Sequence, residues 1–154
     1  MSRPSALAAA ALLSLAACSE GPLKGIGKDA LDAAINDRMG DPNTCVLIGE
    51  AGSGDLVHRF GSNVTCGHVL PACDGAARTV GGLLEATARS RQQVTISCAS
   101  TADGARTVGW AAGPVETRED LVYAAAMEGP NTPPGMVIAD KLKAAFEKVG
   151  LIRR

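Results

Sequence analysis

Residues 94–127 read VTISCASTADGARTVGWAAGPVETREDLVYAAAM, and they set the architecture expected for the whole chain. Apolar and polar residues alternate on both sides of Asp103-Gly104, with Val94, Ile96 and Cys98 pointing one way before the turn. Such alternation around a turn predicts a β-hairpin. Residues 121–127 are apolar throughout, which is typical of a strand covered on both faces. The stretch therefore predicts three consecutive strands, the last of them central in a sheet.

Helices and a second hairpin are expected outside this stretch. Apolar residues at helical spacing predict a helix at 28–39, and Gly52-Ser53-Gly54 predicts a tight turn between two strands. Asp74 is a good N-cap for the next helix, in which Gly81-Gly82 would allow a close approach. The expected elements are, in order, a helix at 28–39, strands at 45–51 and 55–61, a helix at 77–91, strands at 94–98, 108–112 and 121–127, and a helix at 138–149 ended by Gly150.

This order, α-β-β-α-β-β-β-α, predicts an α/β (α+β) domain with a five-stranded, mostly antiparallel sheet packed by helices. A length of 154 residues, 46% of them hydrophobic, suits one such domain. The net charge of -1 argues against a polybasic nucleic-acid binder, so we expect no nucleic-acid partner. With aromatics at 3%, the core must consist of small aliphatic residues, and few rings are available to stack on bases or sugars.

The first eighteen residues have the pattern of an export signal. Arg3 supplies one positive charge, and the apolar run at 6–17 is shorter than the roughly 20 residues that a spanning helix needs. The segment Leu15-Ala16-Ala17-Cys18 resembles a bacterial lipobox, which implies cleavage before Cys18 and acylation of its thiol with a fatty acid such as palmitate. The alternative is an ordinary secretory signal that contains a cysteine.

The lipobox divides the chain into a signal peptide at 1–17, a lipidated tether at 18–27 and a single sheet-and-helix domain at 28–154. Because the mature chain carries no basic excess, membrane attachment would depend on acyl chains, each buried methylene contributing about 0.8 kcal/mol. Ser19 after the cysteine resembles the sorting signal for the outer membrane, with the domain facing the periplasm. The expected partners are the membrane, through the lipid, and another envelope protein. The sequence carries no signal for an oligomeric state.

Four further cysteines, Cys45, Cys66, Cys73 and Cys98, predict two disulfides, because the periplasm is kept oxidising. Cys66-x-His68 with the other thiols could also hold a metal, but the spacing matches no metal knuckle, so no metal or cofactor is expected. Antiparallel pairing in the first hairpin puts Cys45 opposite a residue near Gly61, five residues before Cys66. A Cys45–Cys66 bond is therefore within reach. The competing scheme pairs Cys66 with Cys73 and Cys45 with Cys98.

Two families share the predicted element order. The first is the roadblock or longin-like group, which implies an interaction module. The second is the penicillin-recognising serine hydrolase fold, as in class D beta-lactamases, which Leu70-Pro71-Ala72-Cys73-Asp74 and residues 101–113 resemble. This likeness implies that the start of the second helix lies against the third strand, which would bring Cys73 to Cys98 across the place of the nucleophile. Yet the chain has no Ser-x-x-Lys, and Cys98-Ala99-Ser100 replaces the Lys-Thr-Gly pattern, so we expect no hydrolysis of beta-lactams.

Two features could serve binding. Trp110, between two small residues, could present an aromatic face or belong to the core. The proline-rich segment at 127–135, which contains Asn131, could be a stiff recognition loop or a simple connection. We name no catalytic residue, and interpret His58 and His68 as structural or exposed. The sequence thus predicts a non-catalytic cell-envelope lipoprotein with a binding or structural domain, the alternatives being a reduced serine hydrolase and a roadblock-like module.

Overall fold

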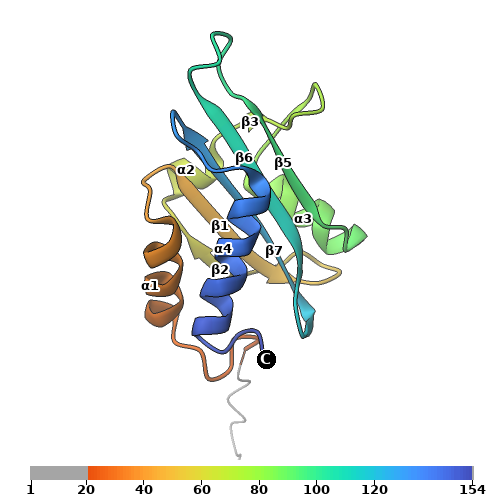
Figure 1. The fold of residues 1–154 in the computed structure, drawn as a ribbon. Coiled ribbons are helices and arrows are strands. Elements are labelled where there is room, and N and C mark those ends of the chain that lie inside the picture. Colours follow the sequence, from red (N-terminus) through yellow and green to blue (C-terminus); the bar gives the residue numbers. More distant parts are fainter. Residues whose placement is uncertain (1–20, 154) are drawn as a thin grey trace, which may run out of the picture.

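A computed structural model describes residues 21–153 of the chain. Its elements, in chain order, are α1 (Lys28–Met39), β1 (Thr44–Glu50), β2 (Leu56–Phe60), α2 (Asn63–Gly67), β3 (Leu70–Pro71), β4 (Ala77–Arg78), α3 (Val80–Ser90), β5 (Val94–Ala99), β6 (Thr107–Val115), β7 (Arg118–Gly129) and α4 (Gly135–Lys148). The five long strands form one antiparallel sheet in the order β2-β1-β7-β6-β5. The predicted fold class and element order are confirmed, and β7 is the central strand (Figure 1).

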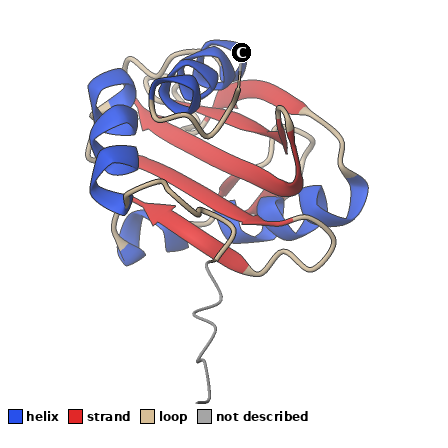
Figure 2. Ribbon diagram, turned by 90° about the horizontal axis from the view of Figure 1, so that it is seen from below, coloured by secondary structure: helices blue, strands red, loops and turns tan. Residues whose placement is uncertain are grey.

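Helices cover both faces of the sheet (Figures 1 and 2). Helices α1 and α4 pack together on one face, and α3 lies on the other. Alternate residues of β7 serve the two faces: Leu121 and Ala125 belong to the cluster under α1 and α4, whereas Val122 and Ala124 belong to the cluster under α3. This double burial explains why 121–127 contains no polar position facing solvent.

The second predicted helix begins later than expected. It starts at Val80, where the Thr79 side chain accepts a hydrogen bond from the Gly82 N–H at 3.1 Å. The prediction that Asp74 is its N-cap is wrong, because Asp74 instead accepts from the Ala76 N–H at 3.1 Å within a turn. Between β2 and α3 the chain forms two elements that the sequence pattern did not predict, the short helix α2 and the two-stranded β3–β4 sheet.

Close packing of backbones occurs at Gly109 and Gly135, not at the predicted Gly81-Gly82 pair. A Cβ at Gly81 or Gly82 would meet only the Thr79 side chain, at 3.8 and 3.5 Å. A Cβ at Gly135 would lie 2.2 Å from the Trp110 carbonyl oxygen, and one at Gly109 would lie 2.6 Å from that of Pro133. The two glycines therefore let the start of α4 lie directly on β5 and β6.

Residues 21–27, the described part of the expected tether, pack against the domain. Leu23 and Ile26 are partly buried beside the cluster under α1 and α4. The Arg118 guanidinium donates a hydrogen bond to the Pro22 carbonyl oxygen. The compact unit thus begins before Lys28, the predicted boundary. Within residues 21–153, no helix is long and apolar enough to cross a membrane.

Candidate functional site

The two disulfides join Cys45 to Cys66 and Cys73 to Cys98, with Cα–Cα distances of 5.1 and 5.5 Å. The preferred pairing is confirmed, and the competing scheme with Cys66–Cys73 is wrong. The first bond ties α2 to the start of β1, and the second ties the loop after β3 to the edge strand β5. Cys18, the predicted lipidation residue, lies outside the described residues.

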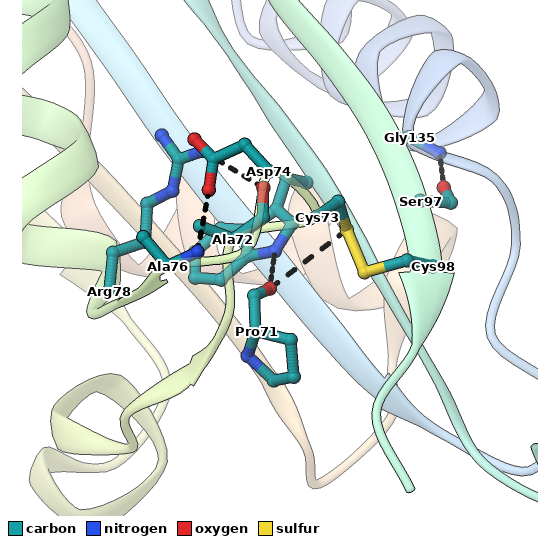
Figure 3. The surroundings of a disulfide bond; sticks show 10 residues. Pro71, Ala72, Cys73, Asp74, Ala76, Arg78, Ser97, Cys98 and Gly135 are labelled. Atoms are coloured by element: carbon teal, nitrogen blue, oxygen red, sulfur yellow. Dashed lines mark hydrogen bonds and ion pairs between the residues drawn. A yellow bond between two sulfur atoms is a disulfide. The ribbon is translucent and has the colours of Figure 1, made fainter. Parts of the chain in front are cut away.

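The Cys73–Cys98 bond holds the loop after β3 against β5 (Figure 3). This loop, which we call the lid, covers Trp110. The Pro71 carbonyl oxygen accepts a hydrogen bond from the Trp110 indole N–H at 2.8 Å. Arg78 lies over the indole ring, 5.6 Å from its centroid, and donates to the Ala72 carbonyl oxygen at 3.0 Å. The loop reaches Cys98 because Cys73 adopts a left-handed backbone conformation, with φ of 68°.

Trp110 therefore serves as a core residue and presents no aromatic face to a ligand. Its exposed fraction is 0%, because the lid covers it on one side and α3 packs nearby. The interpretation of Trp110 as a binding surface is wrong. Asn131 is exposed, in the connection between β7 and α4, beside a cavity of about 110 Å³ that Asp41 also lines. Trp110 and Asn131 thus do not form one site.

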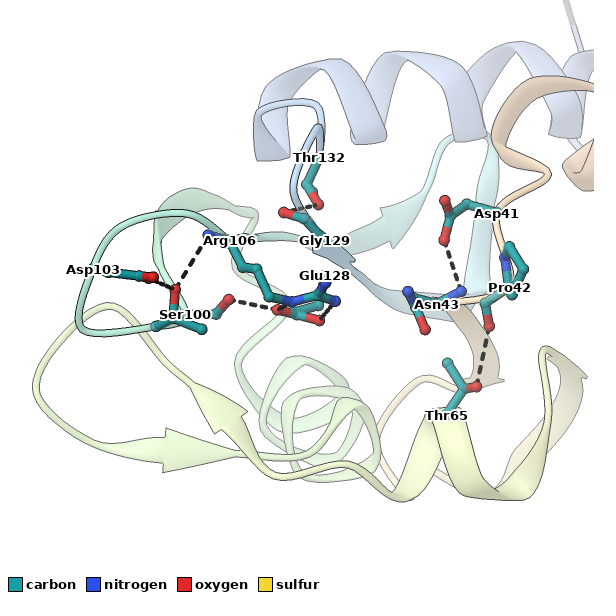
Figure 4. A network of polar contacts seen from close by, with 11 residues as sticks. Asp41, Pro42, Asn43, Thr65, Ser100, Asp103, Arg106, Glu128, Gly129 and Thr132 are labelled. Atoms are coloured by element: carbon teal, nitrogen blue, oxygen red, sulfur yellow. Dashed lines mark hydrogen bonds and ion pairs between the residues drawn. The ribbon is translucent and has the colours of Figure 1, made fainter.

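The turn at 100–106, the connection at 129–134 and the lid loop at 72–76 lie at one end of the molecule, which we call the distal end. Charged side chains gather there, near Asn131 (Figure 4). The Glu128 carboxylate accepts from Arg106 Nε at 2.8 Å and Nη2 at 2.6 Å, and from Ser100 Oγ at 2.6 Å. The hydrogen bonds from Arg106 lower the pKa of Glu128. Burial raises this pKa, and the single hydrogen bond from Ser100 lowers it further. The network fixes the β5–β6 turn to the end of β7.

We expect Glu128→Gln to lower the melting temperature by a few degrees at pH 7, because it removes the charge that Arg106 binds. A carboxylate whose folded pKa is depressed stabilises the protein above its unfolded pKa and loses that contribution as pH falls through the folded value. The difference between the two proteins should therefore shrink below about pH 4. Thermal unfolding at pH 7 and pH 3 measures it, with Glu85→Gln on α3 as a matched control. An equal difference at both pH values would contradict this account.

The two histidines lie in different surroundings: His58 contacts α1, and His68 lies near Glu128, whose pKa its charge helps to lower. His58 on β2 is 5% exposed, and its Nε2 lies 2.8 Å from Asp32 Oδ1 on α1. This pair joins the edge strand β2 to α1, so His58 makes a structural contact. His68 is exposed in the loop after α2. Among residues 21–153, no three His, Cys, Asp or Glu side chains are placed to hold a metal ion.

A second concave site, the α4 cleft, lies between α4 and the β6–β7 hairpin and has a volume of about 280 Å³. Tyr123, Phe146 and Gly113 line its inner part, while Glu116, Asp140 and Lys143 lie nearer its rim. No pattern in the sequence predicted this site, because Tyr123 and Gly113 become neighbours only through the β6–β7 register. Compared with protein-family models, curated proteins and solved structures, the chain has no significant match.

Proposed function

We propose that this protein is a bacterial cell-envelope lipoprotein, anchored through Cys18, whose disulfide-bonded domain acts by binding. One observation carries the proposal: the two disulfides use four of the five cysteines, which leaves Cys18 at the end of the apolar leader. A lipobox needs its cysteine free for acylation. Disulfides of this kind persist in oxidising compartments such as the periplasm, which supports export of the domain.

The position of the domain relative to the anchor supports a role at the membrane surface. An extended chain spans at most about 3.6 Å per residue, so the four steps from Cys18 to Pro22 cover roughly 14 Å. Pro22 is already bound to Arg118. A lipid on Cys18 would therefore hold this end of the domain against the bilayer. The distal end, at the opposite end in Figure 1, would face the periplasm and any envelope protein that binds there.

The structure of the lid favours binding over hydrolysis. Where the likeness to serine hydrolases would put a nucleophile, Cys73 is bonded to Cys98 and the loop is held by Trp110 and Arg78. Asp74, the residue nearest that position, serves a backbone turn. These contacts close the surface where a nucleophile would lie, whereas the distal end and the α4 cleft each carry a concave site.

We expect Cys18→Ser to abolish membrane association, because it removes the thiol that would carry the lipid. Wild-type protein should fractionate with the membrane and have the mass of residues 18–154 plus acyl chains. The variant should be released, or should retain residues 1–17. Mass spectrometry of both fractions measures this, with Ser19→Ala as the control that keeps the thiol. Unchanged mass and fractionation of the Cys18 variant would refute the anchor.

A further inference from the structure

The floor of the α4 cleft is formed by neighbouring residues of β6 and β7. Gly113 on β6 lies directly opposite Tyr123 on β7, and Gln93 packs over Gly113, where a Cβ would lie 3.6 Å from its Cα atom. Phe146 from α4 packs edge-on against Tyr123, with ring centroids 5.8 Å apart and planes at 75°. The cavity of about 280 Å³ is close to the lower limit of small-molecule pockets, roughly 300 Å³. A single water molecule, which occupies about 30 Å³, would leave most of it empty.

The Tyr123 hydroxyl is a polar group in the wall of the cleft that stays accessible to solvent, although most of the residue is buried. Tyr123 is only 8% exposed and lines the cleft, and no group within residues 21–153 forms a hydrogen bond with its hydroxyl. A ligand that fills the cleft without a polar atom at this place would take the hydroxyl out of water without giving it a hydrogen bond, which is costly. A polar atom that enters the cleft can therefore satisfy this hydroxyl without displacing an existing contact.

The charges around the cleft favour a cation. Lys143 is bound to Glu116, with Nζ 2.8 Å from the carboxylate, and so its charge is already neutralised. Asp140 has no ion-pair partner in the described chain, which leaves a net charge of about −1 among these three rim residues. Burial raises the pKa of Tyr123 to about 12, with further contributions from Glu116 and Asp140. The hydroxyl stays protonated at neutral pH and lies in a negative potential.

We propose that the α4 cleft binds a primary ammonium group on a short apolar stem. The ammonium would donate to the Tyr123 hydroxyl oxygen and to the Asp140 carboxylate, and the stem would lie against Phe146. A neutral alkyl group would leave Tyr123 unsatisfied, and a carboxylate would meet Asp140 with like charge. The ammonium could come from a free alkylamine or from a lysine-type side chain of a peptide. This proposal specifies the binding role proposed above and does not require the lipid on Cys18.

Calorimetric titration of the full-length protein in an uncharged detergent tests the proposal. The probes are n-pentylammonium, with pentanol and pentanoate as matched neutral and anionic probes, and N-acetyl-lysine methylamide, with its norleucine analogue as control. We expect saturable binding of at least one ammonium probe, weakened by added NaCl, and none of its uncharged or anionic counterpart. Stronger binding of the lysine derivative would indicate a peptide as the source, and stronger binding of pentylammonium a free amine. Tyr123 is the only tyrosine, so binding should also perturb its ultraviolet absorption.

Two variants test the assigned contacts. Tyr123→Phe and Asp140→Asn should each weaken ammonium binding roughly 2- to 10-fold, the range expected for one hydrogen bond. Glu85→Gln makes the same charge change on α3, across the sheet, and should bind like wild type. Equal affinity of all three variants, equal binding of pentanoate, or the absence of saturable binding by both ammonium probes would overturn the proposal. Binding should persist in the Cys18→Ser protein, so failure of the anchor and failure of the cleft give different results.

Discussion

Replacing Gly135 with alanine is expected to destabilise the protein by more than about 4 kcal/mol, or to prevent folding. The new Cβ would lie 2.2 Å from the Trp110 carbonyl oxygen and 2.7 Å from the Ile96 amide nitrogen. Both are backbone atoms in paired strands, so neither can move aside as a side chain would. The start of α4 would have to lift, breaking the hydrogen bond from the Gly135 N–H to Ser97 Oγ. Urea unfolding followed by Trp110 fluorescence and circular dichroism measures the loss.

Gly67→Ala is the matched control for this prediction. A Cβ at Gly67 would meet nothing within 4 Å, and the residue lies at the end of α2 without positive φ. We expect a change below about 1 kcal/mol, in line with ordinary surface substitutions. If Gly135→Ala were as stable as Gly67→Ala, α4 would not rest on β5 and β6 as described.

Removal of either disulfide should lower the free energy of unfolding by about 3 kcal/mol, and removal of both by roughly twice that. The sequence separations of 21 and 25 residues are similar, so the loss of chain constraint should be similar for the two bonds. Together they represent a large part of the 5–15 kcal/mol that is typical of folded domains. Urea unfolding of the Cys45→Ser/Cys66→Ser and Cys73→Ser/Cys98→Ser variants measures each contribution.

Tryptophan fluorescence distinguishes the effect of removing one disulfide from the effect of removing the other. Of the two disulfides, only Cys73–Cys98 joins the lid to the sheet beside Trp110, so its removal should shift the native emission of the single tryptophan toward that of an exposed indole. The Cys45–Cys66 variant should retain the native spectrum while it is folded. Identical unfolding midpoints with and without reductant would contradict the stabilising role of both bonds.

The alternation of residues predicted the β5–β6 hairpin well because a strand has a period of two that side-chain chemistry reflects directly. Ile96 does face Trp110 across the hairpin, and α1 has the predicted bounds. The start of α3 could not be predicted in the same way, since Asp74 and Thr79 are both good N-caps. The choice between them is made by distant contacts, the bond to Cys98 and the hydrogen bond from Trp110.

The candidate sites were harder to predict because their residues meet only after folding. Trp110 is covered by Pro71, a residue 39 positions away, and the alternation of residues in a strand does not predict such a contact. The core and surface interpretations of Trp110 are therefore both compatible with the sequence pattern. Tyr123 and Gly113 are ten positions apart, and only the β6–β7 register makes them neighbours. Leu23 and Ile26 carried a usable signal, since two apolar residues in a short polar-flanked segment indicate packing against a domain.

The two ends of the described chain meet at one place on the surface, with consequences for protein engineering. Arg118 binds the Pro22 carbonyl oxygen, and the adjacent Thr117 accepts a hydrogen bond from the Arg153 N–H at 3.1 Å. A short linker could therefore join the ends, with new termini opened in the exposed turn around Gly104. With a lipid on Cys18, as proposed above, a fluorescent protein fused after Arg154 would be crowded by the membrane. The same reporter inserted at that turn would project away from it, as the opposite ends in Figure 1 indicate.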